Sequence, residues 1–156
     1  MVKLNLGCGE DKREGYTNVD IRKEVNPDLV HDLEKPLPFP DNSVEEIIAF
    51  DIVEHFSFHK VEEILRDWFR VLKPGGVIHI RCPDMEAIAE KVILSGKFGW
   101  KEISWYVYGG QDYEFNYHKA GFTKRTLKEL LESIGFVVEE IREDGFTNMY
   151  CRARKP

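Results

Sequence analysis

Cysteine is scarce in this sequence and shows no metal-binding pattern. Cys8, Cys82 and Cys151 are the only three among 156 residues, and no Cys-x-x-Cys pair occurs. Cysteines spaced this far apart favour neither a zinc cluster nor a disulfide framework. We therefore predict no metal site from them, and we expect a reducing compartment.

Long apolar runs are also missing. The opening segment MVKLNLGCGE is interrupted by Lys3 and Asn5, so it does not resemble the apolar part of a signal peptide. No apolar run approaches the ~18 residues that a membrane helix needs. The sequence therefore predicts a cytoplasmic protein that makes no use of a membrane.

Positive charge is in short supply. Lys and Arg number 22 against 28 Asp and Glu, which gives a net charge of −6. Neutralising phosphates requires a basic face, so the balance argues against a nucleic-acid partner, whereas a cationic small ligand is compatible with it. The 42% hydrophobic content excludes intrinsic disorder. The length predicts a single domain over residues 1–156.

Two phosphate-binding signatures are absent or incomplete. Gly7 and Gly9 fit the dinucleotide pattern G-x-G-x-x-G, but Lys12 stands at its third position. The third glycine lets the following helix pack closely beside the pyrophosphate, so its loss argues against NAD or FAD. No G-x-x-x-x-G-K-[ST] segment occurs, which excludes a P-loop enzyme. A cofactor without phosphates fits the glycines better.

Apolar periodicity predicts strands that alternate with helices. Strands are expected at Val2–Leu6, Tyr16–Ile21, Leu29–Leu33, Glu46–Val53 and Val77–Cys82. Helices are expected at Phe58–Leu72, from the N-cap Asp84 to Leu94, and from the N-cap Thr123 to Gly135. The end of the chain reads as a β-hairpin, with strands at Phe136–Arg142 and Phe146–Ala153.

This alternation predicts an α/β fold with a doubly wound, Rossmann-like sheet. The sheet is expected to be mainly parallel, with an antiparallel C-terminal hairpin strand. Parallel neighbours need about a dozen connecting residues, and the first two connections are too short to hold full crossover helices. We therefore expect few or no helices over the first three strands.

Polar or glycine residues follow four of the predicted strands, at Gly7-Cys8-Gly9, Asp20, Asp32 and Asp51. Ligands of open parallel sheets bind at the carboxyl ends of the strands. Glycine permits a tight turn there. A carboxylate such as that of Asp20 can accept hydrogen bonds from both hydroxyl groups of a ribose. The pattern predicts a nucleoside-type site. Asp20 as a strand-end cap and Asp32 as the partner of a surface cation remain the structural alternatives.

Five motifs in order carry a resemblance to a known family. They are LNLGCG, NVDI, HDLEKPLPFPDNSVEEI, AFDIVEHF and RVLKPGGVIHIRCPD. Together they resemble the class I S-adenosylmethionine-dependent methyltransferases, especially the small type-11 methyltransferase-domain proteins, from Val2 to about Arg142. The resemblance implies a seven-stranded sheet with a reversed last strand, S-adenosyl-L-methionine as cofactor, and methyl transfer.

The resemblance also implies cofactor-binding residues at the four strand ends. Leu6, Gly7, Cys8 and Gly9 would form the turn beneath the cofactor; Asp20 and Ile21 would contact ribose and adenine; Asp32 and Leu33 would lie at the adenine; Asp51 and Ile52 would lie near the methionine moiety. Asn5 departs from the family's acidic residue, and Asp11 replaces its third glycine.

Two histidines are candidate catalytic bases. Methyl transfer draws on proximity and orientation, and it needs a base only when the acceptor carries a proton. His55 and His118 have ordinary pKa values near 6.5, which suits that task. The structural alternative for each is a partly buried histidine without a chemical role. Cys8 is interpreted as a small residue and not as a nucleophile.

An aromatic-rich insertion is predicted at about residues 96–122. Its segment 98–117 holds eight of the 19 aromatic residues of the chain. It could supply core, form a substrate lid or pocket wall, or form the surface of a homodimer.

These features predict a methyltransferase that uses S-adenosyl-L-methionine and acts on an unidentified small or medium-sized acceptor. The alternative is a non-catalytic S-adenosylmethionine-binding module that works with a partner chain. A nicotinamide-dependent oxidoreductase is a third hypothesis, which Lys12 opposes.

Overall fold

The computed structural model describes residues 1–156 and contains one seven-stranded sheet. Its order is β3-β2-β1-β4-β5-β7-β6. The strands are β1 (Val2–Leu6), β2 (Thr17–Asp20), β3 (Leu29–Val30), β4 (Val44–Phe50), β5 (Leu72–Pro83), β6 (Val137–Asp144) and β7 (Asn148–Arg154). Strand β7 is antiparallel to both β5 and β6, and the other neighbouring pairs are parallel. The predicted mainly parallel sheet with an antiparallel hairpin strand is confirmed.

The connections between the first three strands are short, as predicted. A single turn of 3-10 helix, η1 (Lys23–Val25), lies between β2 and β3, and no helix lies between β1 and β2. The strand order reverses between β1 and β4. The carboxyl ends of these two strands are therefore the topological switch point, where an open sheet of this kind binds its ligands.

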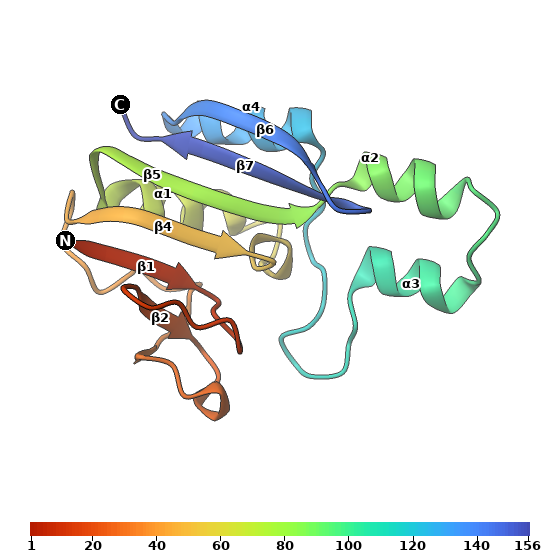
Figure 1. The fold of residues 1–156 in the computed structure, drawn as a ribbon, viewed down its shortest axis with the longest axis horizontal. Helices are drawn as coiled ribbons and strands as arrows, with labels where there is room; N and C mark the ends of the chain where they lie inside the picture. The colour runs from red at the N-terminus through yellow and green to blue at the C-terminus, as the bar shows by residue number, and fades with distance from the viewer.

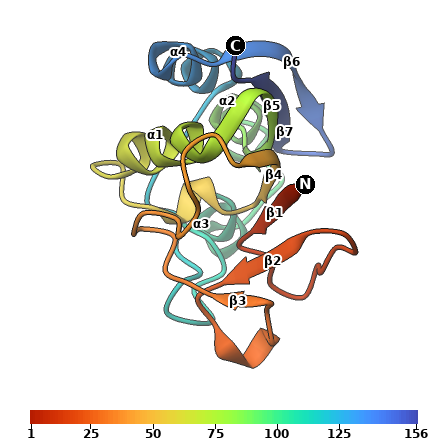
Figure 2. The same cartoon turned by 90° about the vertical axis from the view of Figure 1, so that its left-hand side faces the viewer.

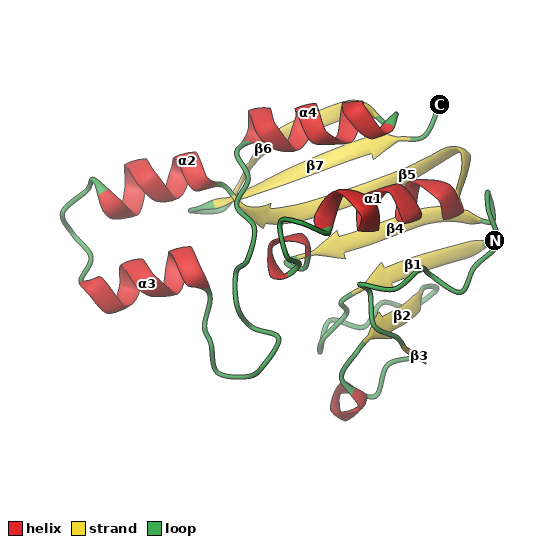
Figure 3. Ribbon diagram, turned by 180° about the vertical axis from the view of Figure 1, so that it is seen from behind, coloured by secondary structure: helices red, strands yellow, loops and turns green.

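Two long helices cover one face of the sheet. Helices α1 (Val61–Val71) and α4 (Lys124–Ile134) lie on the same side of the strands in Figures 2 and 3. Apolar residues recur along α1 with helical spacing, and its Leu65 and Trp68 are fully buried against the sheet. The predicted N-cap of α4 is confirmed, because the side chain of Thr123 accepts from the Thr126 N–H.

The opposite face of the sheet carries polar side chains instead of helices. Glu46 in β4 accepts from the hydroxyl of Tyr16 at 2.8 Å and pairs with Lys3 at 2.8 Å. His79 in β5 lies 3.5 Å from the same carboxylate and bonds the Tyr150 hydroxyl at 2.7 Å. Mutual hydrogen bonding of this kind leaves the face compatible with water.

Strands β4 and β5 differ from their predicted bounds. β4 ends at Phe50 because Asp51 takes a left-handed conformation with φ 54°, which breaks the extended chain. The following residues form η2 (Val53–His55), a turn of 3-10 helix that begins at Val53, the last residue of the predicted strand. β5 begins at Leu72, so Lys73–Gly76, which were interpreted as a helix stop, already belong to that strand.

A helical arm projects beyond the carboxyl ends of the strands (Figure 1). It begins at the predicted N-cap Asp84 and runs through α2 (Met85–Ile88), the π-helical turn η3 (Ala89–Ile93) and α3 (Trp100–Tyr108). Helix α3 was not predicted from the sequence. The chain returns along residues 109–122, where the N–H groups of Lys119 and Ala120 donate to the Glu54 carbonyl at 2.7 and 3.1 Å. None of the helices has the length and apolar character needed to cross a membrane.

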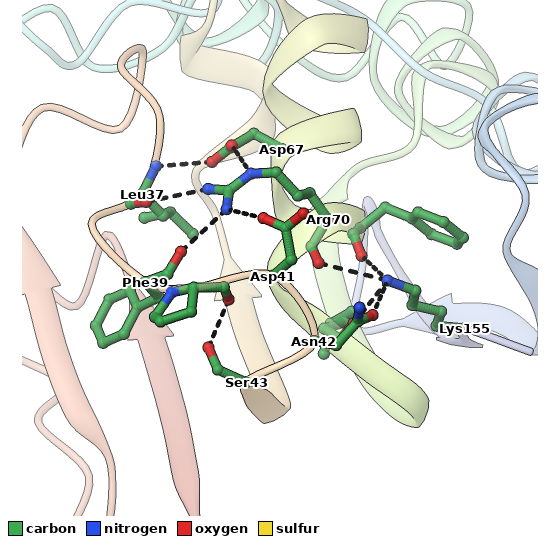
Figure 4. A network of polar contacts seen from close by, with 11 residues as sticks. Leu37, Phe39, Asp41, Asn42, Ser43, Asp67, Arg70 and Lys155 are labelled. Carbon is green, nitrogen blue, oxygen red and sulfur yellow. Dashed lines mark hydrogen bonds and ion pairs between the residues drawn. The ribbon is translucent and has the colours of Figure 1, made fainter.

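A polar network fixes the proline-rich segment 34–42 against α1 (Figure 4). The Arg70 guanidinium donates to the carbonyls of Leu37 and Phe39 at 3.1 and 3.0 Å and pairs with Asp67 and Asp41 at 2.8 and 2.7 Å. The ammonium of Lys155 donates to the carbonyls of Phe69 and Leu72 and to the side chain of Asn42. The network therefore holds the end of α1 in place.

Candidate functional site

The turns that follow β1 and β4 pack against each other at the switch point. Gly7 ends β1 with φ 66°, a conformation that favours glycine. A Cβ atom at Gly7 would lie 2.7 Å from Cγ1 of Ile52, closer than side chains tolerate. Glycine is therefore required here on two grounds, and the contact places the segment after β4 beside the end of β1.

A cavity of about 240 Å³ opens between these turns, which we call the first cavity. Most of the predicted cofactor residues line it, namely Gly7, Asp20, Ile21, Asp32, Leu33, Asp51 and Ile52. Three of the predicted residues do not. Leu6 is fully buried in the core, and Cys8 is buried, with the pKa of its thiol raised by desolvation. Gly9 does not line the cavity, but its backbone N–H donates to the carboxylate of Asp20.

The carboxylate of Asp20 is buried and held in a fixed orientation. One oxygen accepts from the Gly9 N–H at 2.8 Å, and the other accepts from the N–H and Nε of Arg22 at 2.9 and 3.3 Å. A carboxylate offers about four acceptor positions, so capacity remains for a donor in the cavity. Asp20 thus combines a structural role with a free acceptor at the cavity wall.

Asn5 explains one departure from the family pattern. It is buried and donates to the Asp11 carbonyl at 2.7 Å and to the side chain of Asn18 at 3.0 Å. The amide therefore holds the loop after β1, and it does not line the first cavity. An acidic residue could not donate these bonds in its ionised form.

Aromatic residues from the arm cover the first cavity. Tyr113 and Phe115 line its mouth, and the Arg22 guanidinium lies 4.7 Å from the centre of the Tyr113 ring. Lys119 and Phe56 complete the wall. The aromatic segment stands out in the sequence, but no pattern in it indicates which of its residues turn toward the cavity.

A second cavity of about 460 Å³ lies between the sheet and the arm. It shares Asp51 and His55 with the first cavity, so the two adjoin at these side chains. Its wall combines aromatic and polar groups, among them Trp105, Tyr106, Asn116, His118, Asp144, Phe146 and Asn148. A wall of this composition suits a small molecule with polar substituents.

The structure brings both predicted histidines together at this junction. The rings of His55 and His118 lie 5.1 Å apart, centre to centre. Burial lowers the pKa of each: the neighbouring His118 lowers that of His55 further, and backbone hydrogen bonds to Val107 and Tyr106 partly oppose the effect at His118. Both rings are therefore neutral at pH 7 and able to accept a proton or a ligand bond.

Glu54 belongs to the same cluster and was missed in the sequence. Its side chain is almost completely buried, and burial raises its pKa to about 8. Its oxygen Oε2 has no hydrogen-bond partner. The only sequence signal was a carboxylate inside the apolar run of AFDIVEHF.

Asp51 carries the remaining charge at the junction. Its carboxylate pairs with the Arg81 guanidinium, whose pKa is raised by that hydrogen bond. With Asp20, Asp32 and Glu34, it gives the first cavity four carboxylates against the two cations Arg22 and Lys119, beside the apolar side chains of Ile21, Leu33 and Ile52. This combination suits a nucleoside that carries positive charge: apolar contacts for a base, acceptors for hydroxyls, and anions for a cationic end.

Comparisons with known proteins show similarity to methyltransferases. Residues 10–80 match a family described as methyltransferase domain. A probable S-adenosylmethionine-dependent methyltransferase of Mycolicibacterium smegmatis is 30% identical over 129 residues, which are 82% of this chain and 39% of that protein. The chain thus spans about two fifths of that relative, and it spans 28% of an O-methyltransferase of Dictyostelium discoideum.

Solved structures share the fold over nearly the whole chain. A methyltransferase from Archaeoglobus fulgidus that depends on S-adenosylmethionine has a TM-score of 0.69 and 20% identity, covering 98% of this chain and 85% of its own. A chain from a Haloferax volcanii complex between the Trm112 methyltransferase activator and a methyltransferase has a TM-score of 0.69 and 15% identity, covering 99% and 82%. At these identities the likeness concerns the fold.

Proposed function

We propose that this chain, whose methyltransferase-domain match and relatives support a class I S-adenosylmethionine-dependent methyltransferase, transfers the methyl group of that cofactor to a small or medium-sized acceptor. The first cavity would hold the cofactor, and the second would hold the acceptor. One observation carries the proposal: the two cavities adjoin at Asp51 and His55, so two ligands bound in them would meet there.

The residues of the first cavity fit S-adenosyl-L-methionine. Asp20 would accept from the ribose, Ile21 and Leu33 would pack on the adenine, and Asp32 would accept from its amine. Gly7 and Ile52 form the floor, and Asp51 lies where the positively charged methionine end would extend. The bound cofactor supplies a methyl group on a sulfonium, which leaves as a neutral thioether when an acceptor lone pair forms the new bond.

The histidines would act on the acceptor. For an acceptor that carries a proton, His55 or His118 would take that proton as the new bond forms, since both rings are neutral at pH 7. The aromatic wall of the second cavity would orient the acceptor and exclude water.

Methyl transfer itself tests the proposal. Purified protein is incubated with S-adenosylmethionine and pooled small-molecule extracts, and S-adenosylhomocysteine formation is followed by mass spectrometry. We expect product with the native chain and little with Asp20→Ala. Binding of the cofactor without product in any pool would select the alternative, a binding module that works with a partner chain.

The proposal includes the setting of the reaction. We place the reaction in the cytoplasm, because Cys8, Cys82 and Cys151 are widely spaced in the sequence and suggest a reducing compartment. The acceptor is expected to be a small molecule, because a net charge of −6 disfavours nucleic acid. A homodimer through the arm would appear as a doubled mass in sedimentation, and a single domain over residues 1–156 would unfold in one transition.

A further inference from the structure

Three ligating side chains converge on the second cavity. Glu54, His55 and His118 each offer one donor atom, and these atoms all lie within 4.8 Å of one another. Nε2 of His55 lies 4.0 Å from Oε1 of Glu54. All three residues line the second cavity, and Glu54 and His55 come from η2 whereas His118 comes from the returning loop. The tertiary fold alone brings them together.

The imidazole of His55 is oriented for ligation. Its Nδ1 lies 3.0 Å from the carbonyl oxygen of Tyr117. Because a carbonyl can only accept, the proton resides on Nδ1, and the lone pair of Nε2 points toward Glu54. Backbone carbonyls that fix a histidine in this way are typical partners of metal-binding imidazoles. His118 is placed by its backbone, whose N–H donates to the carbonyl of Tyr108 at the end of α3 at 3.0 Å.

The protein supplies no hydrogen-bond donor to one oxygen of the buried Glu54 side chain. The side chain of Glu54 is 4% exposed, and its Oε2 makes no hydrogen bond. The nearest guanidinium, that of Arg81, is paired with Asp51 instead. A buried carboxylate oxygen without a partner is costly, and native structures seldom leave one unexplained.

We propose that Glu54, His55 and His118 form a binding site for one divalent metal ion of the first transition row. Two imidazole nitrogens and one carboxylate oxygen are the ligand set of such ions, whereas Mg²⁺ and Ca²⁺ prefer oxygen ligands alone. Ligands about 2.1 Å from a tetrahedral ion lie about 3.4 Å apart, so donor atoms as far as 4.8 Å apart must approach one another by about 1.4 Å. With three protein ligands, a position stays open toward the second cavity.

The ion's task rests on the proposed function, although its binding does not. An acceptor hydroxyl at the open position would bind the ion through oxygen, which lowers the pKa of that hydroxyl and releases its proton to solvent. With both imidazoles bound to it, the ion would take over the task that His55 or His118 has as a base in the metal-free protein. The oxygen lone pair then forms the O–CH₃ bond as the S–CH₃ bond breaks, and the electron pair of that bond stays on sulfur. The acceptor class is therefore an alcohol or phenol, methylated on oxygen.

The test is a titration of chelator-treated protein with Co²⁺ and Zn²⁺, followed by visible absorption and calorimetry. We expect one ion per chain and much weaker binding of Mg²⁺. Loss of a ligand in Glu54→Gln or His118→Ala should weaken Co²⁺ binding about 100-fold or more, since loss of an outer partner alone costs 10–100-fold. Circular dichroism establishes that each variant is folded.

A matched control is available on the open face of the sheet. His79 also lies beside a glutamate, at 3.5 Å from Glu46, but no second histidine completes that pair. His79→Asn should leave Co²⁺ affinity unchanged. Equal loss in this variant, absence of stoichiometric binding, or equal affinity for Mg²⁺ would overturn the metal site. If methyl transfer persists after chelation, the ion has no role in the reaction and the proposed function stands. If the protein binds the metal but transfers no methyl group, the metal site stands and the proposed function fails.

Discussion

Asp20 is the residue on which cofactor binding should depend most. It is the buried carboxylate of the first cavity, already oriented by Gly9 and Arg22. A hydrogen bond to a charged group contributes about 1.5–3 kcal/mol, so Asp20→Asn should weaken S-adenosylhomocysteine about 10- to 100-fold in calorimetry. Asp28→Asn is the control, because Asp28 also accepts from backbone at 2.8 Å but lies outside the cavity. Equal effects of both changes would contradict a specific role for Asp20.

Both the backbone conformation and the packing at position 7 require glycine. Gly7→Ala should lower the free energy of unfolding by about 1–3 kcal/mol, because the new methyl group meets Ile52 in a left-handed backbone. Gly96→Ala separates the two causes. Its φ of 68° matches that of Gly7, but nothing lies within 4 Å of the added Cβ. Urea unfolding should show the larger loss at Gly7, and similar losses would remove the packing argument.

The end of helix α1 depends on a lysine near the end of the sequence. Lys155 donates to the carbonyl of Phe69 in the last turn of α1, where carbonyls lack partners within the helix, and to the carbonyl of Leu72, the first residue of β5. Lys155→Met keeps the apolar stem and removes the donors, so the free energy of unfolding should fall by about 1–2 kcal/mol. Lys73→Met, which removes only an exposed ion pair with Glu45, should change it by less than about 1 kcal/mol. Chemical denaturation compares the two variants.

The returning loop of the arm should control how firmly the cofactor is held. Tyr113 lies at the mouth of the first cavity and stacks on Arg22, whereas Tyr108, at the end of α3, is 57% exposed and lines neither cavity. Tyr113→Ala should weaken S-adenosylhomocysteine about tenfold, since aromatic and cation–π contacts contribute about 1–2 kcal/mol. Tyr108→Ala should leave the affinity unchanged. A larger loss of affinity in Tyr108→Ala than in Tyr113→Ala would contradict a role for Tyr113 in holding the cofactor.

Sequence patterns predicted the elements of the sheet better than those of the arm. Helix α4 was predicted with its cap at Thr123 and its stop at Gly135, because capping and apolar periodicity act within one turn of chain. Helix α3 has no buried residue, and its N-cap Gly99 has no side chain that could mark the start of the helix in the sequence. Asp51 was placed correctly beside the site, but its left-handed turn was read as strand.

For the whole molecule, ligand binding should appear as a rise in melting temperature. A ligand at ~100 times its dissociation constant adds about 2.7 kcal/mol, which corresponds to roughly 5–10 °C for a chain of this length. We expect this rise with S-adenosylmethionine and S-adenosylhomocysteine and none with NAD or ATP. A rise with NAD alone would favour the oxidoreductase hypothesis and contradict the family's cofactor.

The face of the sheet opposite α1 and α4 is a property of the whole fold. Its side chains pair among themselves, as Lys3, Tyr16 and His79 do around Glu46. The sequence could not predict which face of the sheet each helix covers. The length of a connection shows whether a crossover helix fits between two strands, but it does not show on which face that helix packs.

The sequence by itself determined which segments form strands and helices. These are the strands that are followed by Gly7 and Asp51 or end at Asp20, the helices capped by Asp84 and Thr123, and the hairpin at the end of the chain. These features follow from hydrogen bonding and side-chain spacing between near neighbours. Only the tertiary structure decided that the Asp51 and Gly7 turns touch, and that Glu54 and His55 meet His118 across 62 residues or more. Contacts between distant segments arise from packing of the whole core, and no local pattern records them.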